Sequence, residues 1–525
     1  MPEIKQQNIF LEELNKSLPR VLSLFDSDQT SLSYGLGDRF FWAWGLTDFA
    51  NATYQGCAQG LARIWVAGLW PYDSCEESFI KKIQSFFAGA KFLTRKNGSL
   101  EEAFPHEGSY CVTALVAFDL LVTIDLLSDR INDSKRDEFV EIIRPFINFL
   151  IKSDESHAII SNHLATAVAA LVRWDNLISD SNALAKAKAL LNRMLVNQSE
   201  EGWFKEYEGS DPGYQTLCLH YLSDVHLQRK EMNLLEPISK SIRFLLYFAH
   251  PDGSFGGYYG SRCTRFYYPS GVLAMAEEVP EAAVLATFMQ NSTAENRVVG
   301  LSCMDDPNLT PMFNSYAWAA TLLKQNKQIS IQNNAQLLPC ESYQPFRKNF
   351  KDAGLFVDRG LDYYSIINYK KGGVIYHFSK KDLSILDCGV VIQSSFGILG
   401  SGHFYDENQD VKIEDECIQI RHRISEMPKK LMSPFKFLML RILCFTIFRN
   451  SYMREFTKKI LVRYLITKPK IWRIWNEREI RLGRNLEITD NFDSKAGYRK
   501  SKINQPFVPI HMASQGYWQL KDEES

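Results

Sequence analysis

The sequence predicts a multidomain α+β protein in which an N-terminal (α/α) toroid is followed by an antiparallel β-sandwich. Two observations support this prediction. In the first part of the chain a polar cluster recurs about every 50 residues, each time before a small, apolar helical stretch, and a repeat of this length is typical of helical pairs. Near residue 344, helical periodicity gives way to short β-branched and aromatic runs that are typical of strands.

Six polar clusters define the expected inner helices of the toroid. We take the following residues as the starts of these helices: Phe49, Ser109, Ser161, Asp211, Ser270 and Asn314. Between them, stretches such as 138–150 and 183–196 have the apolar periodicity of amphipathic outer helices. The pairs form a six-fold helical-hairpin barrel, or an incomplete one, and the connectivity puts all inner N-termini at one mouth. This mouth is the expected location of a functional site.

The pattern also predicts domain boundaries. The toroid is assigned to residues 1–325, a polar linker to 326–343 and the β-sandwich to 344–525. Four runs in the sandwich have strand character: 354–358, 363–369, 373–378 and 388–393. A basic segment at about 428–470 has helical character, and we expect it to be an insertion in the sandwich before a final strand region.

The net charge of −1 conceals a strongly basic segment near the C-terminus. Between residues 421 and 484 the chain has 17 Lys or Arg against 4 Asp or Glu. Such a face attracts anions such as acidic glycans or an anionic membrane surface, and a solvated surface is an equal alternative. A peripheral membrane contact through 421–484 is therefore one prediction. Nucleic acid is not an expected partner, because the segment lacks a recognisable reader motif.

Composition and cysteine use favour a globular protein of the reducing cytoplasm. The chain is 45% hydrophobic and 23% charged, and its 10 cysteines have no spacing that suggests a metal site. No Walker A loop or strand-borne GxGxxG motif is present, so no cofactor is expected. The N-terminus lacks the regions of a signal peptide. The longest apolar run, 435–448, is too short and too charged to cross a bilayer, and it suits a packed helix or an insertion better than an interfacial helix.

Two of the polar clusters combine side chains that suit β-elimination from a uronic acid. Asp211 is an expected N-cap, with Pro212 at the first helical position and Tyr214 on the first turn. Asn162 and His163 open another inner helix, where exposed N–H groups and the helix dipole favour anions. Asn162 would bind the carboxylate, and Tyr214 and His163 would handle the α-proton and the leaving oxygen. Capping and core packing are the structural alternatives for each residue alone.

Further residues near the expected mouth are candidates for substrate binding. Arg262 and Arg265 are close enough in sequence to clamp a carboxylate or sulfate. Aromatic side chains make up 13% of the chain, and Tyr207 and Tyr258 lie in polar clusters where sugars could stack. The acidic candidates at the mouth are Glu107, Glu208 and Asp211.

Three segments carry a resemblance to a known family. Residues 161–163, 206–214 and 252–257, followed by a β-rich half, resemble the heparinase II/III-like polysaccharide lyases and their alginate-lyase relatives. The resemblance implies cleavage of acidic polysaccharide by elimination, with Asn162 as carboxylate neutraliser, Tyr214 as acid/base and His163 or a neighbour as partner base. The family tends to supply a further His from its β-domain. His377 is the candidate here, and His403 is the alternative.

Other functions remain open on this fold. A glycoside hydrolase would use two carboxylates, for which Glu107, Glu206, Glu208 and Asp211 are available. A non-catalytic protein of a surface-polysaccharide pathway would bind acidic glycan in the same groove. The turns at 198–203 and 252–256 also resemble those of terpene cyclases and prenyltransferases, but no DDxxD run or zinc set accompanies them. An acidic polysaccharide or oligosaccharide is the expected partner.

Overall fold

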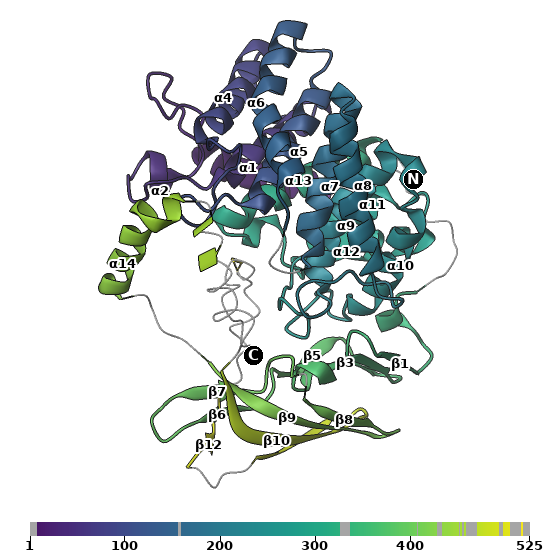
Figure 1. Ribbon diagram of the computed structural model, residues 1–525. Coiled ribbons are helices and arrows are strands. Elements are labelled where there is room, and N and C mark those ends of the chain that lie inside the picture. Colours follow the sequence, from purple (N-terminus) through teal and green to yellow (C-terminus); the bar gives the residue numbers. More distant parts are fainter. Residues whose placement is uncertain are drawn as a thin grey trace, which may run out of the picture.

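The computed structural model confirms the predicted fold class, with a helical toroid followed by antiparallel β-sheets (Figure 1). The structure describes residues 8–155, 159–325, 337–406, 408–427, 433–450, 452–453, 456–457, 470–492, 497–503 and 516–517. Most of the predicted linker and a large part of the basic segment lie outside these residues. The domain boundaries therefore stay a prediction.

Six inner helices form the toroid in the described part of the chain. They are α3 (Cys57–Val66), α5 (Tyr110–Leu126), α7 (Ser161–Ile178), α9 (Pro212–Gln228), α11 (Pro269–Ala274) and α13 (Asp306–Gln325). Each packs on the next, and α13 packs on α3, so the ring closes. Small residues permit this packing. A Cβ atom on Gly271 of α11 would lie only 2.4 Å from the backbone carbon of Leu219 in α9.

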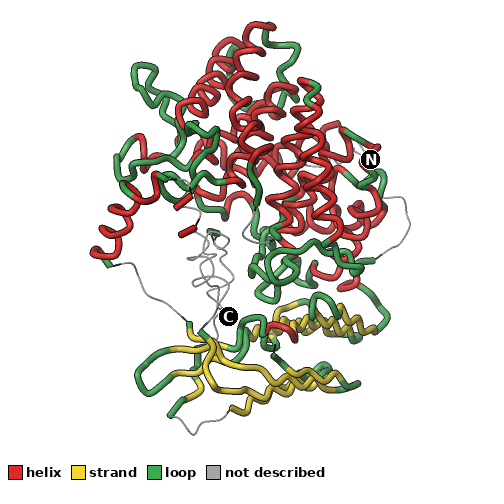
Figure 2. The backbone as a smooth tube through the Cα atoms, in the orientation of Figure 1, coloured by secondary structure: helices red, strands yellow, loops and turns green. Residues whose placement is uncertain are grey.

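Outer helices pack around this ring. Figure 2 shows the helical part of the chain in red and the strands in yellow. The outer helices are α1 (Ile9–Ser23), α4 (Glu76–Leu93), α6 (Asp133–Lys152), α8 (Ser181–Val196), α10 (Leu235–Leu245) and α12 (Pro280–Ala294). A short helix, α2 (Arg39–Trp42), lies outside the ring. The 3-10 turns of the toroid are η1 (Ala52–Gly56), η2 (Lys230–Met232), η3 (Leu246–Phe248) and η4 (Leu301–Cys303). Within residues 8–155 and 159–325, the helices thus form six pairs.

The helix starts agree with four of the six predicted positions. Ser109 caps α5, Ser161 is the first residue of α7, Asp211 caps α9, and Ser270 is the second residue of α11. The first inner helix begins later than Phe49, because Asn51 caps the 3-10 turn η1 before α3 begins at Cys57.

The prediction that a helix begins at Asn314 was wrong. Helix α13 begins at Asp306, and Asn314 lies in its middle, facing α3. Its amide accepts a hydrogen bond from the Gly60 N–H at 3.0 Å and donates one to the Gly56 carbonyl at 3.0 Å. The Asn314 side chain therefore links α13 to the start of α3, where the ring closes. It is not the N-cap of α13.

Asn314→Ala is expected to lower the free energy of unfolding by about 1–3 kcal/mol, because it leaves the buried Gly60 N–H of α3 and the Gly56 carbonyl of η1 without their Asn314 partner. Urea denaturation of the variant measures the loss. The matched control is Asn291→Ala on the exposed face of α12, for which a change within about 0.5 kcal/mol is expected. Equal effects of the two substitutions would contradict the role of Asn314 in ring closure.

The described residues of the β-region form two antiparallel sheets. The first has strands β1 (Phe346–Phe350), β2 (Leu355–Arg359), β3 (Tyr363–Asn368), β4 (Val374–Ser379) and β5 (Asp382–Asp387) in sequence order. The second has β6 (Val391–Gln393), β7 (Leu399–Ser401), β8 (Asp410–Ile413), β9 (Cys417–Glu426), β10 (Ile471–Arg481), β11 (Glu487–Phe492) and β12 (Arg499–Lys500). Its order is β11-β10-β9-β7-β6-β12, with β8 on β9. Turns η5 (Pro339–Glu341) and η6 (Tyr369–Lys371) complete this region.

The first sheet is buried on both faces. Val357, Ile366 and Tyr376 join the large core of the toroid, whereas Ile367 and Ile375 pack with residues of the second sheet. This alternation follows from the two-residue repeat of a strand. Because both faces of the sheet are buried, the sequences of β2, β3 and β4 are nearly continuous apolar runs. The face that carries Val357, Ile366 and Tyr376 packs against the toroid.

Part of the basic segment is helical. Helix α14 (Pro434–Phe445) and turn η7 (Ile447–Arg449) lie between β9 and β10, which pair directly with each other. Among the residues that the structure describes, no helix has both the length and the apolar character needed to cross a membrane.

Candidate functional site

Three loops lie side by side at the N-terminal mouth of the ring. Ile160 forms a β-bridge with Glu206, and the Ser161 N–H donates to the Lys205 carbonyl at 3.1 Å. The Ser261 N–H donates to the Ser210 carbonyl at 2.8 Å, and its hydroxyl donates to the Glu206 carbonyl at 2.8 Å. These bonds hold together the starts of α7 and α9 and the loop before α11.

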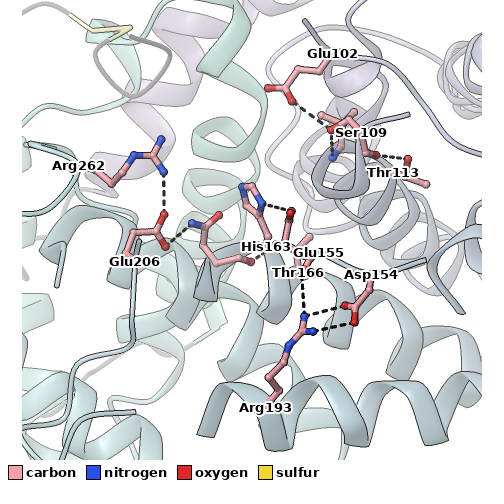
Figure 3. A network of polar contacts seen from close by, with 12 residues as sticks. Glu102, Ser109, Thr113, Asp154, Glu155, His163, Thr166, Arg193, Glu206 and Arg262 are labelled. Atoms are coloured by element: carbon pink, nitrogen blue, oxygen red, sulfur yellow. Dashed lines mark hydrogen bonds and ion pairs between the residues drawn. The ribbon is translucent and has the colours of Figure 1, made fainter. Parts of the chain in front are cut away.

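Four side chains from these loops form a largely buried network, and Figure 3 shows its Glu206 and Arg262. The Asn162 Nδ2 donates to Glu206 Oε2 at 2.9 Å, and the Arg262 Nη1 donates to Glu206 Oε1 at 2.9 Å. The other terminal nitrogen of Arg262 lies 3.4 Å from the Tyr214 hydroxyl. The guanidinium also lies over two rings, 4.5 Å from the Tyr214 centroid and 4.9 Å from that of Tyr207.

Burial controls the titration of this network. It raises the pKa of Glu206, and Arg262 and Asn162 offset only part of that rise. Burial also raises the pKa of Tyr214 to about 12, against the opposing charge of Arg262. Tyr214 therefore carries its proton at neutral pH, which suits a proton donor.

Asp211 holds the backbone of the site. Its carboxylate accepts the Tyr214 N–H at 3.1 Å and the Arg262 N–H at 2.9 Å, and the Thr264 hydroxyl also donates to it. The predicted N-cap is thus present, and it connects the start of α9 to the loop that carries Arg262. These donors surround the buried carboxylate, so Asp211 fixes the backbone of both segments.

His163 belongs to a second polar group beside the network (Figure 3). Its Nδ1 lies 3.0 Å from Glu155 Oε2, and its side chain is 22% exposed. Burial lowers the pKa of His163, but Cys111 and Glu155 raise it, and the result is well above the usual 6.5. Arg193 donates to Asp154 at 2.9 Å and supports the loop that carries Glu155.

Some of the predicted binding residues lie at the mouth but outside the network. Arg265 lies over the Tyr258 ring at 5.6 Å, with its Nη1 at 3.4 Å from the Tyr258 hydroxyl. Glu208 is exposed. Glu107 accepts backbone N–H groups of Glu102 and Ala103 at 2.7 and 3.1 Å, so its described bonds lie within its own loop.

The two candidate histidines of the β-region differ in their positions. His377 lies within the first sheet, where it contacts the Ser365 hydroxyl at 2.7 Å and the Arg484 carbonyl at 3.1 Å. The structure does not bring it to the network. His403 reaches the toroid instead, with its Nε2 at 3.0 Å from the Tyr258 carbonyl. Burial, with Lys371 nearby, holds the pKa of His403 well below 6.5.

Sequence reasoning missed the supporting partners of the site. Glu206 was considered only as a hydrolase carboxylate, although its position beside Tyr207 in the same polar cluster could have indicated its role. Glu155 lies in the loop before α7 and has no motif that marks it. In the described part of the chain, no group of three or more His, Cys, Asp or Glu side chains could hold a metal ion.

No protein-family model matches the sequence, and no curated protein sequence matches it. Solved structures are similar in fold. A crystal structure of heparinase III matches 93% of this chain and 71% of its own length, with a TM-score of 0.51 and 11% identity. A xanthan lyase from Paenibacillus matches 81% of this chain with a TM-score of 0.48 and 10% identity, and the chain spans only 46% of its length. A cellobiose 2-epimerase from Bacillus thermoamylovorans matches 61% of this chain and 100% of its own length, with a TM-score of 0.44 and 9% identity.

Proposed function

We propose that this protein is a polysaccharide lyase that cleaves a uronic-acid-containing acidic polysaccharide by β-elimination. The observation that supports the proposal is the network of Asn162, Glu206, Arg262 and Tyr214 at the mouth of the toroid, with His163 beside it. It combines an amide, a cation, a protonated phenol and an imidazole. The fold likeness to heparinase III is consistent with this reaction but does not assign it.

In this proposal, Asn162 binds the carboxylate of the uronate by a hydrogen bond. Its Nδ2 carries two hydrogens, and the bond to Glu206 uses one of them and fixes the plane of the amide. The second hydrogen is available to the carboxylate as it gains charge after loss of the α-proton. Donors that are fixed before the reaction stabilise such an intermediate without reorganisation.

His163 and Tyr214 are assigned to the two proton transfers. Neutral His163 removes the proton from C5 of the uronate, and the electron pair forms the C4–C5 double bond as the C4–O4 bond breaks. Tyr214, which is protonated because its pKa is about 12, donates a proton to the leaving O4. The products are an unsaturated uronate and a new hydroxyl, and no water is consumed.

A hydrolase receives less support from the same residues. Glu206 is paired with Arg262, Asp211 accepts several N–H and O–H donors, and Glu107 accepts two backbone N–H groups. Of the four candidate carboxylates, only Glu208 is exposed. Hydrolysis needs an acid and a base or nucleophile that both face the sugar.

A glycan-binding protein without catalysis is the second candidate. The observation that favours it is the position of the β-region histidines, because His377 lies inside the sheet and His403 contacts the Tyr258 carbonyl. The network would then bind the uronate carboxylate without breaking a bond.

The test is incubation of the protein with a panel of uronic-acid polysaccharides, with ultraviolet absorbance and reducing ends followed in parallel. Elimination yields both signals together, because the new double bond is conjugated with the carboxylate. Reducing ends without absorbance would contradict the lyase proposal in favour of a hydrolase. If the protein binds a glycan but produces neither signal, the result would support a glycan-binding protein without catalysis.

The activity is expected to have an alkaline pH optimum. Because the pKa of His163 lies well above 6.5, kcat/KM rises with pH as His163 loses its proton, and it falls as Tyr214 deprotonates near pH 12. Glu155→Gln removes a carboxylate that favours the imidazolium, so the rising limb should move to lower pH. The matched control is Glu200→Gln at an exposed ion pair with Lys240. A rising limb that stays in place in Glu155→Gln would contradict the assignment of His163.

The pairing of His163 with Glu155 should also affect the stability of the fold. The folded pKa of His163 is raised, so the stabilisation from its pairing with Glu155 is present below pH 6.5 and is lost as the pH rises through the raised pKa. The difference in unfolding free energy between wild type and Glu155→Gln should shrink over that range.

A further inference from the structure

Helix α14 exposes an unusual amount of apolar surface. Six of its apolar side chains have exposed fractions between 42% and 70%: Phe435, Phe437, Leu438, Met439, Ile442 and Phe445. Only Cys444 is buried in this helix. A helix that is apolar on most sides is normally covered by protein or lipid. Figure 1 shows α14 projecting from the body of the toroid.

A second exposed apolar segment lies beside it. Phe40, Trp44 and Leu46, in and after α2, have exposed fractions of 59–68%. The Arg441 Nη1 of α14 lies 2.6 Å from Asp48 Oδ1, which fixes the two segments side by side (Figure 1). We call these residues of α14 and of segment 40–46 the apolar ridge. Apolar patches of this kind mark binding surfaces in soluble proteins.

The surroundings of the ridge are basic. Of the described residues, Lys436 and Arg441 lie on α14, and Arg449 lies on η7. Next to η7, a cavity of about 400 Å³ has Arg95, Lys96, His106 and Arg449 in its lining. The Glu101 carboxylate lies 3.3 Å from Arg95, in addition to the Asp48 carboxylate beside Arg441. The positive charge therefore matches an anionic partner.

Helix length limits what can cover the ridge. Helix α14 has 12 residues, whereas a membrane-spanning helix needs about 20. A short apolar helix with flanking cations, accompanied by an exposed Trp, has the features of a segment that lies in the interface between headgroups and acyl chains.

We propose that the apolar ridge docks on the surface of an anionic lipid bilayer. The aromatic and aliphatic side chains of α14 and segment 40–46 insert among the acyl chains. The basic residues around them, including Lys436 and Arg449, contact the anionic headgroups. This attachment holds the protein at a membrane without a spanning helix, and it is independent of the chemistry at the toroid mouth.

Co-sedimentation with vesicles tests the proposal. The full chain is mixed with vesicles of phosphatidylcholine alone or with added phosphatidylglycerol. Binding to the anionic vesicles should be at least about tenfold stronger and should weaken as salt is raised. The triple variant Phe435→Ser/Phe437→Ser/Leu438→Ser should lose at least about tenfold in vesicle binding, because the inserted side chains are gone. Lys436→Gln/Arg449→Gln should lose only the preference for anionic vesicles.

A matched control separates insertion from general hydrophobicity. Phe396→Ser/Leu361→Ser removes two exposed apolar side chains of the β-region, with exposed fractions of 88% and 76%, and should leave vesicle binding unchanged. Circular dichroism and urea denaturation establish that each variant is folded. No binding of the folded wild type to anionic vesicles would overturn the proposal. So would concentration-dependent dimers that the triple variant abolishes, because the ridge would then join two copies of this chain.

Discussion

Tyr214→Phe is expected to lower the rate of elimination by roughly 10²- to 10⁴-fold, the usual contribution of a general acid. The substitution removes the hydroxyl near Arg262 but keeps the ring, which packs edge-on against Phe266 at 5.3 Å. The free energy of unfolding should therefore change little, and glycan binding should persist. Initial rates of unsaturated product, measured beside glycan affinity, determine the effect.

Tyr268→Phe is the matched control for this experiment. Tyr268 also packs edge-on against Phe266 at 5.3 Å and is buried in the same part of the toroid. It lies outside the network that holds Arg262, so its hydroxyl should not affect the rate. Equal losses in the two variants would show that the phenol of Tyr214 has no special role, and the assignment of the proton donor would fail.

Arg262→Met is expected to cost about 3–5 kcal/mol in the free energy of unfolding, because it leaves the buried Glu206 carboxylate without the positive charge that pairs with it. The pKa of Glu206 is already raised by burial and should rise further in the variant. Protonation of Glu206 then relieves the cost, so the variant should gain stability as the pH falls through that pKa. Urea denaturation at several pH values measures both effects.

Two comparisons make this result interpretable. Arg130→Met breaks the exposed pair with Glu76 and should cost only about 0–1 kcal/mol. The double variant Arg262→Met/Glu206→Leu removes both charges and should recover much of the stability lost in Arg262→Met. If Arg262→Met costs no more than Arg130→Met, Glu206 is not a buried charge that depends on Arg262.

The fold was largely predictable because packing in a ring requires the same kinds of residue at equivalent positions of every helical pair. Inner helices that touch neighbours on two sides need small residues such as Gly271, and their exposed N-termini need caps such as Ser109 and Asp211. The error at Asn314 has the same origin. A polar residue before an apolar stretch resembles a cap in sequence, whereas this one bonds the backbone of a helix that is distant in sequence.

The site was predictable only in part. Asn162, His163 and Tyr214 follow helix-start patterns that the sequence alone contains. Arg262 contacts Tyr214 directly and is linked to Asn162 through Glu206. Glu155 is brought to His163 by the loop before α7, and His403 is brought to Tyr258 by the packing of the β-region on the toroid. No local sequence pattern predicts either contact. His377 was chosen by resemblance, but its strand directs it toward Ser365 and away from the toroid.

Mass spectrometry of the products tests the central claim most directly. A uronic-acid oligosaccharide of defined length is incubated with the wild-type protein, and the fragments are weighed. Elimination predicts that the fragment with the new non-reducing end is lighter by one water than the corresponding intact oligosaccharide, and that this fragment is missing with Tyr214→Phe. If every fragment has the mass of a saturated oligosaccharide, water was added across the cleaved bond. That result would contradict elimination and indicate a hydrolase.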